Sequence, residues 1–127
     1  MKRLSLLIVA IFLSACGGSS SSIDGTYSGP INDAVAGAGT ARVTMASNGN
    51  SLSGTWSSTF SNASYNNSGS TSGTISGSSL SMTLAPSNPQ ACPLAVTATQ
   101  SGNQITGTYA TMSCSVTDSG SFNLTKQ

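Results

Sequence analysis

The stretch ARVTMASNGNSLSGTW, residues 41–56, places apolar side chains at alternate positions on both sides of an Asn-Gly pair. Alternation with a period of two is typical of a β-strand with one buried face. Asn-Gly is the strongest short signal for a hairpin, because a type I′ turn needs a positive φ at both central residues. A two-residue loop at Asn48-Gly49 sets Met45 opposite Leu52, apolar against apolar. The stretch therefore predicts an antiparallel hairpin.

Two further turns repeat this arrangement along the chain. Gly-Ser at 77–78 and Gly-Asn at 102–103 each separate two segments in which apolar and polar residues alternate. A register shift of one residue would turn the apolar set of a strand to the opposite face, so the apolar match selects one register. The expected pairs are Ile75 with Leu80, Gly73 with Met82, Val96 with Tyr109, and Ala98 with Gly107.

The remaining segments complete an all-β fold. A first strand at 23–27 and a last strand at 120–126 bring the expected number of antiparallel strands to about eight. Sequential hairpins with polar outer faces predict an up-and-down barrel, in which the last strand pairs with the first and no edge is exposed. An open β-sandwich and a β-solenoid or irregular stack are the alternatives. The tight turns fall at one end, and long connections are expected at the other, at 28–38, 61–70, 86–93 and 111–119.

Three segments share a short motif. They are Ile23–Tyr27 (IDGTY), Leu52–Trp56 (LSGTW) and Ile105–Tyr109 (ITGTY). These segments resemble the Gly-Thr-Trp and Gly-Thr-Tyr strand signatures of streptavidin-like and lipocalin-like barrels, the calycins. The resemblance implies a meander β-barrel. Biotin sites in that family use several tryptophans, whereas Trp56 is the single tryptophan here, so biotin binding is not carried over.

The amino-terminal segment has the pattern of an export signal. A positively charged start at 1–3 precedes an apolar run at 4–13. This run is shorter than the about 20 residues that a membrane-spanning helix needs, so residues 1–15 are predicted to be a signal peptide. The Leu-Ser-Ala-Cys motif that ends at Cys16 resembles the bacterial lipobox. The resemblance implies cleavage before Cys16 and acylation of that cysteine, with palmitate among the expected chains; a plain secretory signal with a chance cysteine is the alternative.

The residues after the signal peptide divide into a tether and one domain. Residues 16–22 hold the lipidated cysteine and a Gly/Ser tether, and residues 23–127 are expected to form a single β-barrel domain. In lipoproteins of this kind an aspartate after the cysteine favours retention at the inner membrane, and Gly17 stands there instead. We therefore expect a lipid-anchored protein of the bacterial cell envelope, at the outer membrane, on its periplasmic or its external side.

The inward positions of the predicted barrel fall into three layers. Aliphatic residues fill the layer next to the tight turns, the middle layer is thin and rich in glycine, and aromatic residues return towards the long connections. Glycines within a strand mark tight coiling or the close approach of another group. Either the aromatic side chains fold into a filled core, or a small apolar pocket with an aromatic rim remains. The residues of this candidate pocket and rim are Tyr27, Gly54, Trp56, Met82, Gly107, Tyr109 and Phe122.

The two cysteines of the predicted domain are expected to form a disulfide. The register set by the turn at 102–103 places Cys92 opposite Ser113, next to Cys114, and an oxidising envelope compartment favours the bond. A redox or metal pair is the alternative. The sequence disfavours it, because the chain has no histidine, no Cys-x-x-Cys motif and only three side-chain carboxylates.

The composition also argues against catalysis. Because histidine is absent, the many serines lack the base that would activate one of them as a nucleophile. A net charge of +1 gives no basic footprint for nucleic acid. We therefore expect no enzyme activity, no cofactor, no metal and no nucleic-acid partner.

Two non-catalytic functions remain. The favoured one is a membrane-anchored envelope lipoprotein that acts as a structural or protein-interaction module through its long-loop end, where Tyr65 is a candidate contact. The alternative is a barrel that binds a small apolar ligand. The expected partners are the lipid bilayer, through acylated Cys16, and a protein or a small apolar ligand at the long-loop end.

Overall fold

The structure is a computed structural model and describes residues 22–127. The predicted signal peptide at 1–15, the predicted lipidation site Cys16 and the tether before residue 22 lie outside the described residues.

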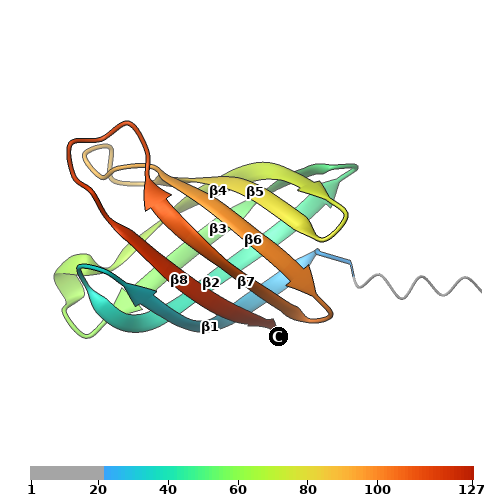
Figure 1. Ribbon diagram of the computed structural model, residues 1–127, viewed down its shortest axis with the longest axis horizontal. Coiled ribbons are helices and arrows are strands. Elements are labelled where there is room, and N and C mark those ends of the chain that lie inside the picture. The colour runs from blue at the N-terminus through green and yellow to red at the C-terminus, as the bar shows by residue number, and fades with distance from the viewer. Residues whose placement is uncertain (1–21) are drawn as a thin grey trace, which may run out of the picture.

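Eight antiparallel strands form a closed barrel (Figure 1). Each strand pairs with its neighbours in sequence, and β8 pairs with β1, so that Tyr27 lies beside Lys126 and Ile31 beside Phe122. The predicted up-and-down barrel is confirmed, and the open sandwich and the solenoid are wrong. The strands are β1 (Gly25–Asp33), β2 (Gly37–Asn48), β3 (Ser51–Phe60), β4 (Asn67–Ser76), β5 (Ser79–Pro86), β6 (Leu94–Ser101), β7 (Gln104–Thr111) and β8 (Ser119–Lys126).

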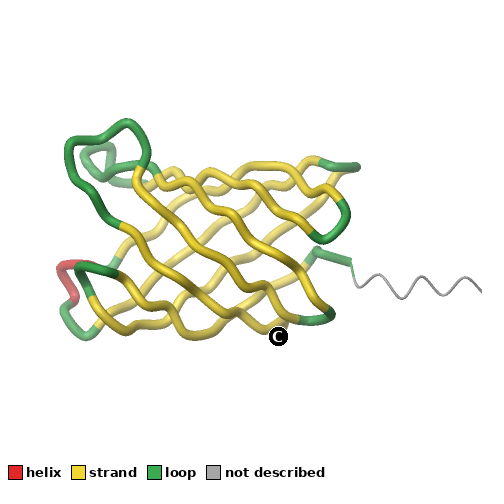
Figure 2. Tube along the Cα trace, viewed as in Figure 1, coloured by secondary structure: helices red, strands yellow, loops and turns green. Residues whose placement is uncertain are grey.

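The two ends of the barrel differ in their connections. The tight turns after β2, β4 and β6 gather at one end, where the described chain also begins and β8 ends (Figure 2). The longer connections gather at the other end, together with the 3₁₀ turn η1 (Ala63–Tyr65). Because the wall closes on itself within residues 22–127, every strand is paired on both sides. The described part of the chain therefore leaves no sheet edge unpaired.

Glycine is the first residue of each tight turn. Gly49, Gly77 and Gly102 have φ angles of 61°, 60° and 59°, whereas the residue that follows each of them does not have a positive φ. A positive φ at the first central position alone is the pattern of a type II′ turn, which takes glycine there. The registers predicted for the turns at 77–78 and 102–103 are confirmed.

The register predicted for the first hairpin is wrong. Its loop is Gly49-Asn50, so Asn48 belongs to β2 and Met45 pairs with Gly54. The loop takes its glycine at the first central position, as the other two tight turns do. The partner of Met45 thus shifts by two residues, from Leu52 to Gly54. Because this number is even, every side chain keeps the face that the alternation predicts.

The first two long connections are shorter than predicted. β1 runs on to Asp33 and β2 begins at Gly37, which reduces the predicted loop at 28–38 to residues 34–36. β3 runs to Phe60 and β4 begins at Asn67, so the second connection covers residues 61–66. The connections after β5 and β7 fall where they were predicted.

The second half of β1 was predicted to be a loop because it contains Gly29 and Pro30, two residues that are common in loops. A Cβ on Gly29 would lie 2.2 Å from the Asn123 carbonyl oxygen of β8, so a residue without a side chain allows this close approach. Pro30 has no backbone N–H to donate, and it lies where the ladder between β1 and β8 is interrupted. Both residues therefore suit the pairing of β1 with β8, the seam that closes the barrel.

Buried aliphatic side chains gather at the tight-turn end of the barrel. Removing each of these side chains from water contributes about 1.5–3 kcal/mol to stability. Together they close this end of the barrel, as the sequence predicts, and we call them the plug. Its buried members are Ile23, Met45, Leu52, Leu80, Ile105 and Leu124.

The outer face of the wall is made largely of serine and threonine. In β4 the exposed alternate positions are Ser68, Ser70, Ser72 and Thr74, and Ser72 lies beside Ser53 of β3. These hydroxyl side chains face solvent, while the opposite face of the same strands packs inward. No helix within residues 22–127 has the length and the apolar character needed to cross a membrane.

The type II′ turn makes a testable prediction about residues 48 and 49. Gly49→Ala should destabilise the fold by about 1–2 kcal/mol, because a Cβ is unfavourable at positive φ. Asn48→Thr should stay within about 0.5 kcal/mol of the parent, because residue 48 is an exposed strand position. Urea unfolding of residues 17–127 measures both effects. A large loss in Asn48→Thr as well as in Gly49→Ala would instead support an Asn48-Gly49 loop, in which both central residues have a positive φ.

Candidate functional site

A cavity of about 340 Å³ lies inside the barrel. It extends from the plug, where Met45 and Leu124 line it, to the long connections, where Tyr65, Gln90 and Val116 line it. We call this second end the mouth; it comprises the connections 34–36, 61–66, 87–93 and 112–118. Of the two alternatives that the sequence leaves open, this cavity favours a pocket over a completely filled core.

Several inward positions in the middle of the wall carry no side chain. Gly54 and Gly107 occupy such positions between larger neighbours on β3 and β7. A Cβ on Gly54 would lie 1.9 Å from the Thr44 carbonyl oxygen, and a Cβ on Gly107 would lie 2.4 Å from that of Thr97. These two glycines allow close approach of adjacent strands, and they do not themselves line the cavity.

Apolar side chains make up most of the cavity wall. Trp56 is buried, and its indole N–H donates a hydrogen bond to the Ser70 carbonyl at 3.0 Å, which satisfies the one polar atom of that side chain. Met82 and Phe122 line the same cavity, as the sequence analysis expected for a pocket. Phe60 also lines the cavity. The sequence prediction does not include this residue, although it continues the alternation of β3.

Tyr27 lies away from the mouth. Its side chain is fully buried and its hydroxyl donates a hydrogen bond to the Ile23 carbonyl at 3.0 Å, next to the plug. The Lys126 ammonium lies 6.0 Å from the centre of its ring. Because β1 continues to Asp33, its residues near the mouth are Ile31 and Asp33, and these two line the cavity in place of Tyr27.

A polar cluster of three side chains stands at the mouth. Tyr109 of β7 donates its hydroxyl hydrogen bond to Oδ2 of Asp33. The other carboxylate oxygen of Asp33 accepts hydrogen bonds from the Val35 and Ala36 N–H groups at 2.9 and 2.8 Å. Asp118 lines the cavity beside them. A Cβ on Gly120 would lie 2.3 Å from the Tyr109 hydroxyl, so this position needs glycine for the ring to reach Asp33.

The cluster shifts the pKa values of its members in opposite directions. Burial would raise the pKa of Asp33, but the hydrogen bonds that it accepts, above all from Ala36, outweigh burial and hold this pKa below its ordinary value. Burial, and then the nearby charge of Asp33, raise the pKa of Asp118. Burial and the hydrogen bond to Asp33 also raise the pKa of Tyr109. Of the two carboxyl groups, Asp33 is therefore the one whose ionised form the cluster stabilises.

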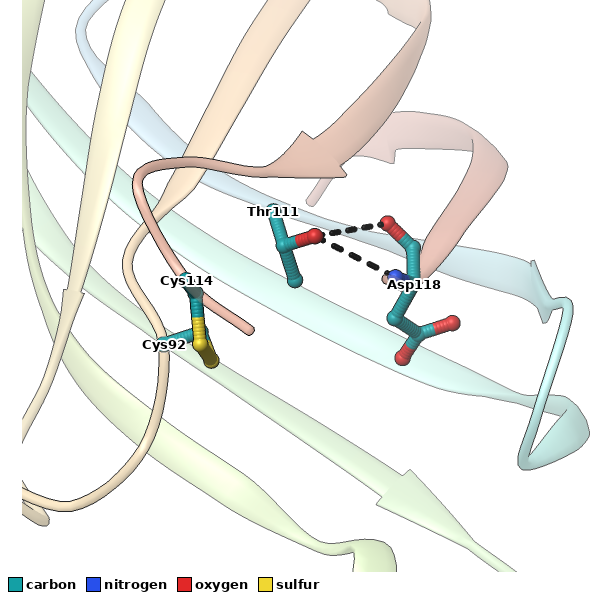
Figure 3. The surroundings of a disulfide bond; sticks show 4 residues. All are labelled: Cys92, Thr111, Cys114 and Asp118. Carbon is teal, nitrogen blue, oxygen red and sulfur yellow. Dashed lines mark hydrogen bonds between the residues drawn. A yellow bond between two sulfur atoms is a disulfide. The ribbon is translucent and has the colours of Figure 1, made fainter. Parts of the chain in front are cut away.

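A disulfide fastens two of the mouth connections to each other (Figure 3). Cys92 precedes β6 and Cys114 follows β7, and their Cα atoms lie 5.9 Å apart, within disulfide distance. Next to the bond, the Asp118 N–H donates to the Thr111 hydroxyl at 3.2 Å, and the Thr111 N–H donates to the Asp118 carbonyl at 3.0 Å. These contacts hold the connection that carries Asp118 in place over the cavity.

Three apolar side chains around the mouth are exposed to solvent. Val35, Tyr65 and Val116 are exposed by 55%, 44% and 58%, and each comes from a different connection. They are the large hydrophobic residues exposed on the described part of the chain. The mouth therefore combines an apolar rim with the polar cluster of Asp33, Tyr109 and Asp118.

Neither a comparison with models of known protein families nor one with curated proteins gives a match for this sequence. Within residues 22–127, no three histidine, cysteine, aspartate or glutamate side chains gather as a metal site would need. The described geometry is that of an apolar cavity with one polar cluster at its mouth.

The disulfide makes a prediction about stability. Replacing Cys92 and Cys114 together by serine in residues 17–127 should cost about 3 kcal/mol in the free energy of unfolding, the chain-entropy value for a loop of this length. Urea unfolding of the parent with a reductant should give the same reduced stability. A parent protein that is insensitive to the reductant would contradict the bond.

The polar cluster makes a prediction about titration. In Asp33→Asn the carboxyl of Asp118 loses the neighbouring charge that helps to raise its pKa, so its carboxyl carbon should titrate at lower pH than in the parent. Asp24→Asn removes a carboxylate that accepts hydrogen bonds from Ser47 near the plug, and it should leave this titration unchanged. NMR detection of the Asp118 carboxyl carbon against pH measures both. Equal midpoints in all three proteins would contradict the proximity of Asp33 and Asp118.

Proposed function

We propose that this protein is a non-catalytic binding protein that takes a small apolar molecule into its barrel through the mouth. The observation that supports the proposal is the apolar cavity of about 340 Å³ above the plug. Small-molecule sites in proteins usually have volumes of about 300–1,000 Å³. A cavity of about 150 Å³ already holds benzene, so two or three linked or fused rings suit the space here.

The wall and the plug support the same proposal from two sides. Trp56, Met82 and Phe122 give a ligand apolar surface to contact. The buried aliphatic residues of the plug close the opposite end. A ligand that enters at the mouth then leaves by the mouth, and its apolar surface is removed from water on all other sides.

A protein contact at the mouth is the second candidate function. The exposed side chains of Val35, Tyr65 and Val116 favour it, because each projects from a separate mouth connection. Exposed apolar patches on a surface that is otherwise polar often mark contact sites. Such a contact is compatible with ligand binding if the partner delivers or receives the ligand.

We place the protein in the bacterial cell envelope, anchored to the outer membrane by acylated Cys16. The Leu-Ser-Ala-Cys motif at 13–16 supports this anchor. The described chain begins at the tight-turn end (Figure 1), and the Gly/Ser tether at 17–22 is short. With the anchor attached there, the mouth faces away from the bilayer.

Binding is tested with the neutral probe N-phenyl-1-naphthylamine and residues 17–127. Its fluorescence should rise on saturable binding, with a micromolar Kd, as follows from about 0.4–0.5 kcal/mol per non-hydrogen atom. Ala98→Leu should weaken binding by about tenfold or more, because Ala98 lines the cavity and a larger side chain fills it.

Ala95→Leu is the matched control for this experiment. Ala95 lies on the same strand, β6, and its side chain is exposed on the outer face. This variant should bind the probe as the parent does. Circular dichroism shows whether both variants keep the fold. The absence of saturable binding to the folded parent, or equal binding by both variants, would contradict the proposed cavity site.

A further inference from the structure

The charges that line the cavity are all negative. Among the described residues, its ionisable lining groups besides tyrosine are Asp33 and Asp118, both at the mouth, and no lysine or arginine lines it. Arg42 is exposed on the outer face of β2, whereas its neighbours Ala41 and Val43 face inward and line the cavity. Lys126 lies over the Tyr27 ring, beside the plug. An anionic group in the cavity would therefore meet a carboxylate with no cation to offset it.

Asp33 is held rigidly at this position. Its two oxygens accept three hydrogen bonds, from the Val35 and Ala36 N–H groups at 2.9 and 2.8 Å and from the Tyr109 hydroxyl. These donors stabilise the ionised carboxylate and leave it little freedom to turn away from a bound molecule. The negative charge at the mouth is thus a fixed part of the site.

We propose that Asp33 is a specificity-determining residue, which makes the cavity accept uncharged apolar molecules and reject anionic amphiphiles such as carboxylates and sulfonates. The inference rests on the proposed binding function and adds the class of ligand. Two like charges roughly 8–10 Å apart in a partly solvated site repel each other enough to weaken binding about tenfold. A neutral molecule of the same shape does not experience this repulsion.

A matched pair of probes tests the selectivity. N-phenyl-1-naphthylamine is neutral, and 8-anilino-1-naphthalenesulfonate carries the same rings with one added sulfonate. Residues 17–127 should bind the sulfonate probe at least about tenfold more weakly than the neutral probe. Asp33→Asn should raise the affinity for the sulfonate probe about tenfold relative to the affinity for the neutral probe. This substitution keeps the oxygen that accepts the two backbone hydrogen bonds.

Asp24→Asn is the control, because it removes the same charge from the plug end of the barrel. It should leave the ratio of the two affinities as in the parent. If Asp33→Asn does not fold, a salt series on the parent replaces it, and the ratio should narrow as ionic strength rises, because salt screens the carboxylate.

Each outcome separates this inference from the proposed function. If the neutral probe does not bind, the binding function itself fails. If both probes bind the parent equally, or if Asp33→Asn leaves the ratio unchanged, binding stands and the role of Asp33 is overturned. If Asp24→Asn changes the ratio as much as Asp33→Asn does, net charge rather than Asp33 sets the selectivity, and the inference is again overturned.

Discussion

The pairing of β1 with β8 is the constraint on which the rest of the structure depends. It closes the wall, and a closed wall of eight strands has a circumference that its side chains cannot reduce. The size of the side chain at each inward position then decides which parts of the interior are filled. Aliphatic side chains fill one end, while Gly54 and Gly107 in the middle of the wall allow adjacent strands to approach closely. An open sheet with the same residues would be free to fold over and fill the cavity.

Closure also assembles the polar cluster from distant parts of the chain. Asp33 ends the first strand, Tyr109 lies in the seventh, and Gly120 lies at the start of the eighth. Across the seam, Asp33 pairs with Gly120, and Tyr109 pairs with the same glycine from the other side. The missing side chain of Gly120 is what lets the phenol reach the carboxylate. The cluster thus forms because β8 lies between β1 and β7, and no local sequence motif produces it.

These relations explain which features could be predicted from sequence. Alternation and glycine turns are local signals, so the barrel, two of its three tight registers and the Cys92–Cys114 pair were accessible. The length of β1 was not, because Gly29 and Pro30 look like loop residues until the backbone of β8 lies beside them. Because the first strand was predicted to end at Tyr27, this residue was expected near the mouth, and Asp33, which ends β1 in the structure, was not expected there. Phe60 continues the alternation of β3, so the local signal for its inward position is present in the sequence.

The serine- and threonine-rich outer face has a consequence for the kinetics of encounter. The described residues carry few charges, and those at the mouth are negative, so the wall produces little long-range electric field to guide a partner by its charge. Encounters with the outer wall should then occur at the unsteered rates of about 10⁵–10⁶ M⁻¹s⁻¹, with little dependence on ionic strength. Short-range contacts must then discriminate among partners. On the described surface, the apolar rim at the mouth provides such contacts.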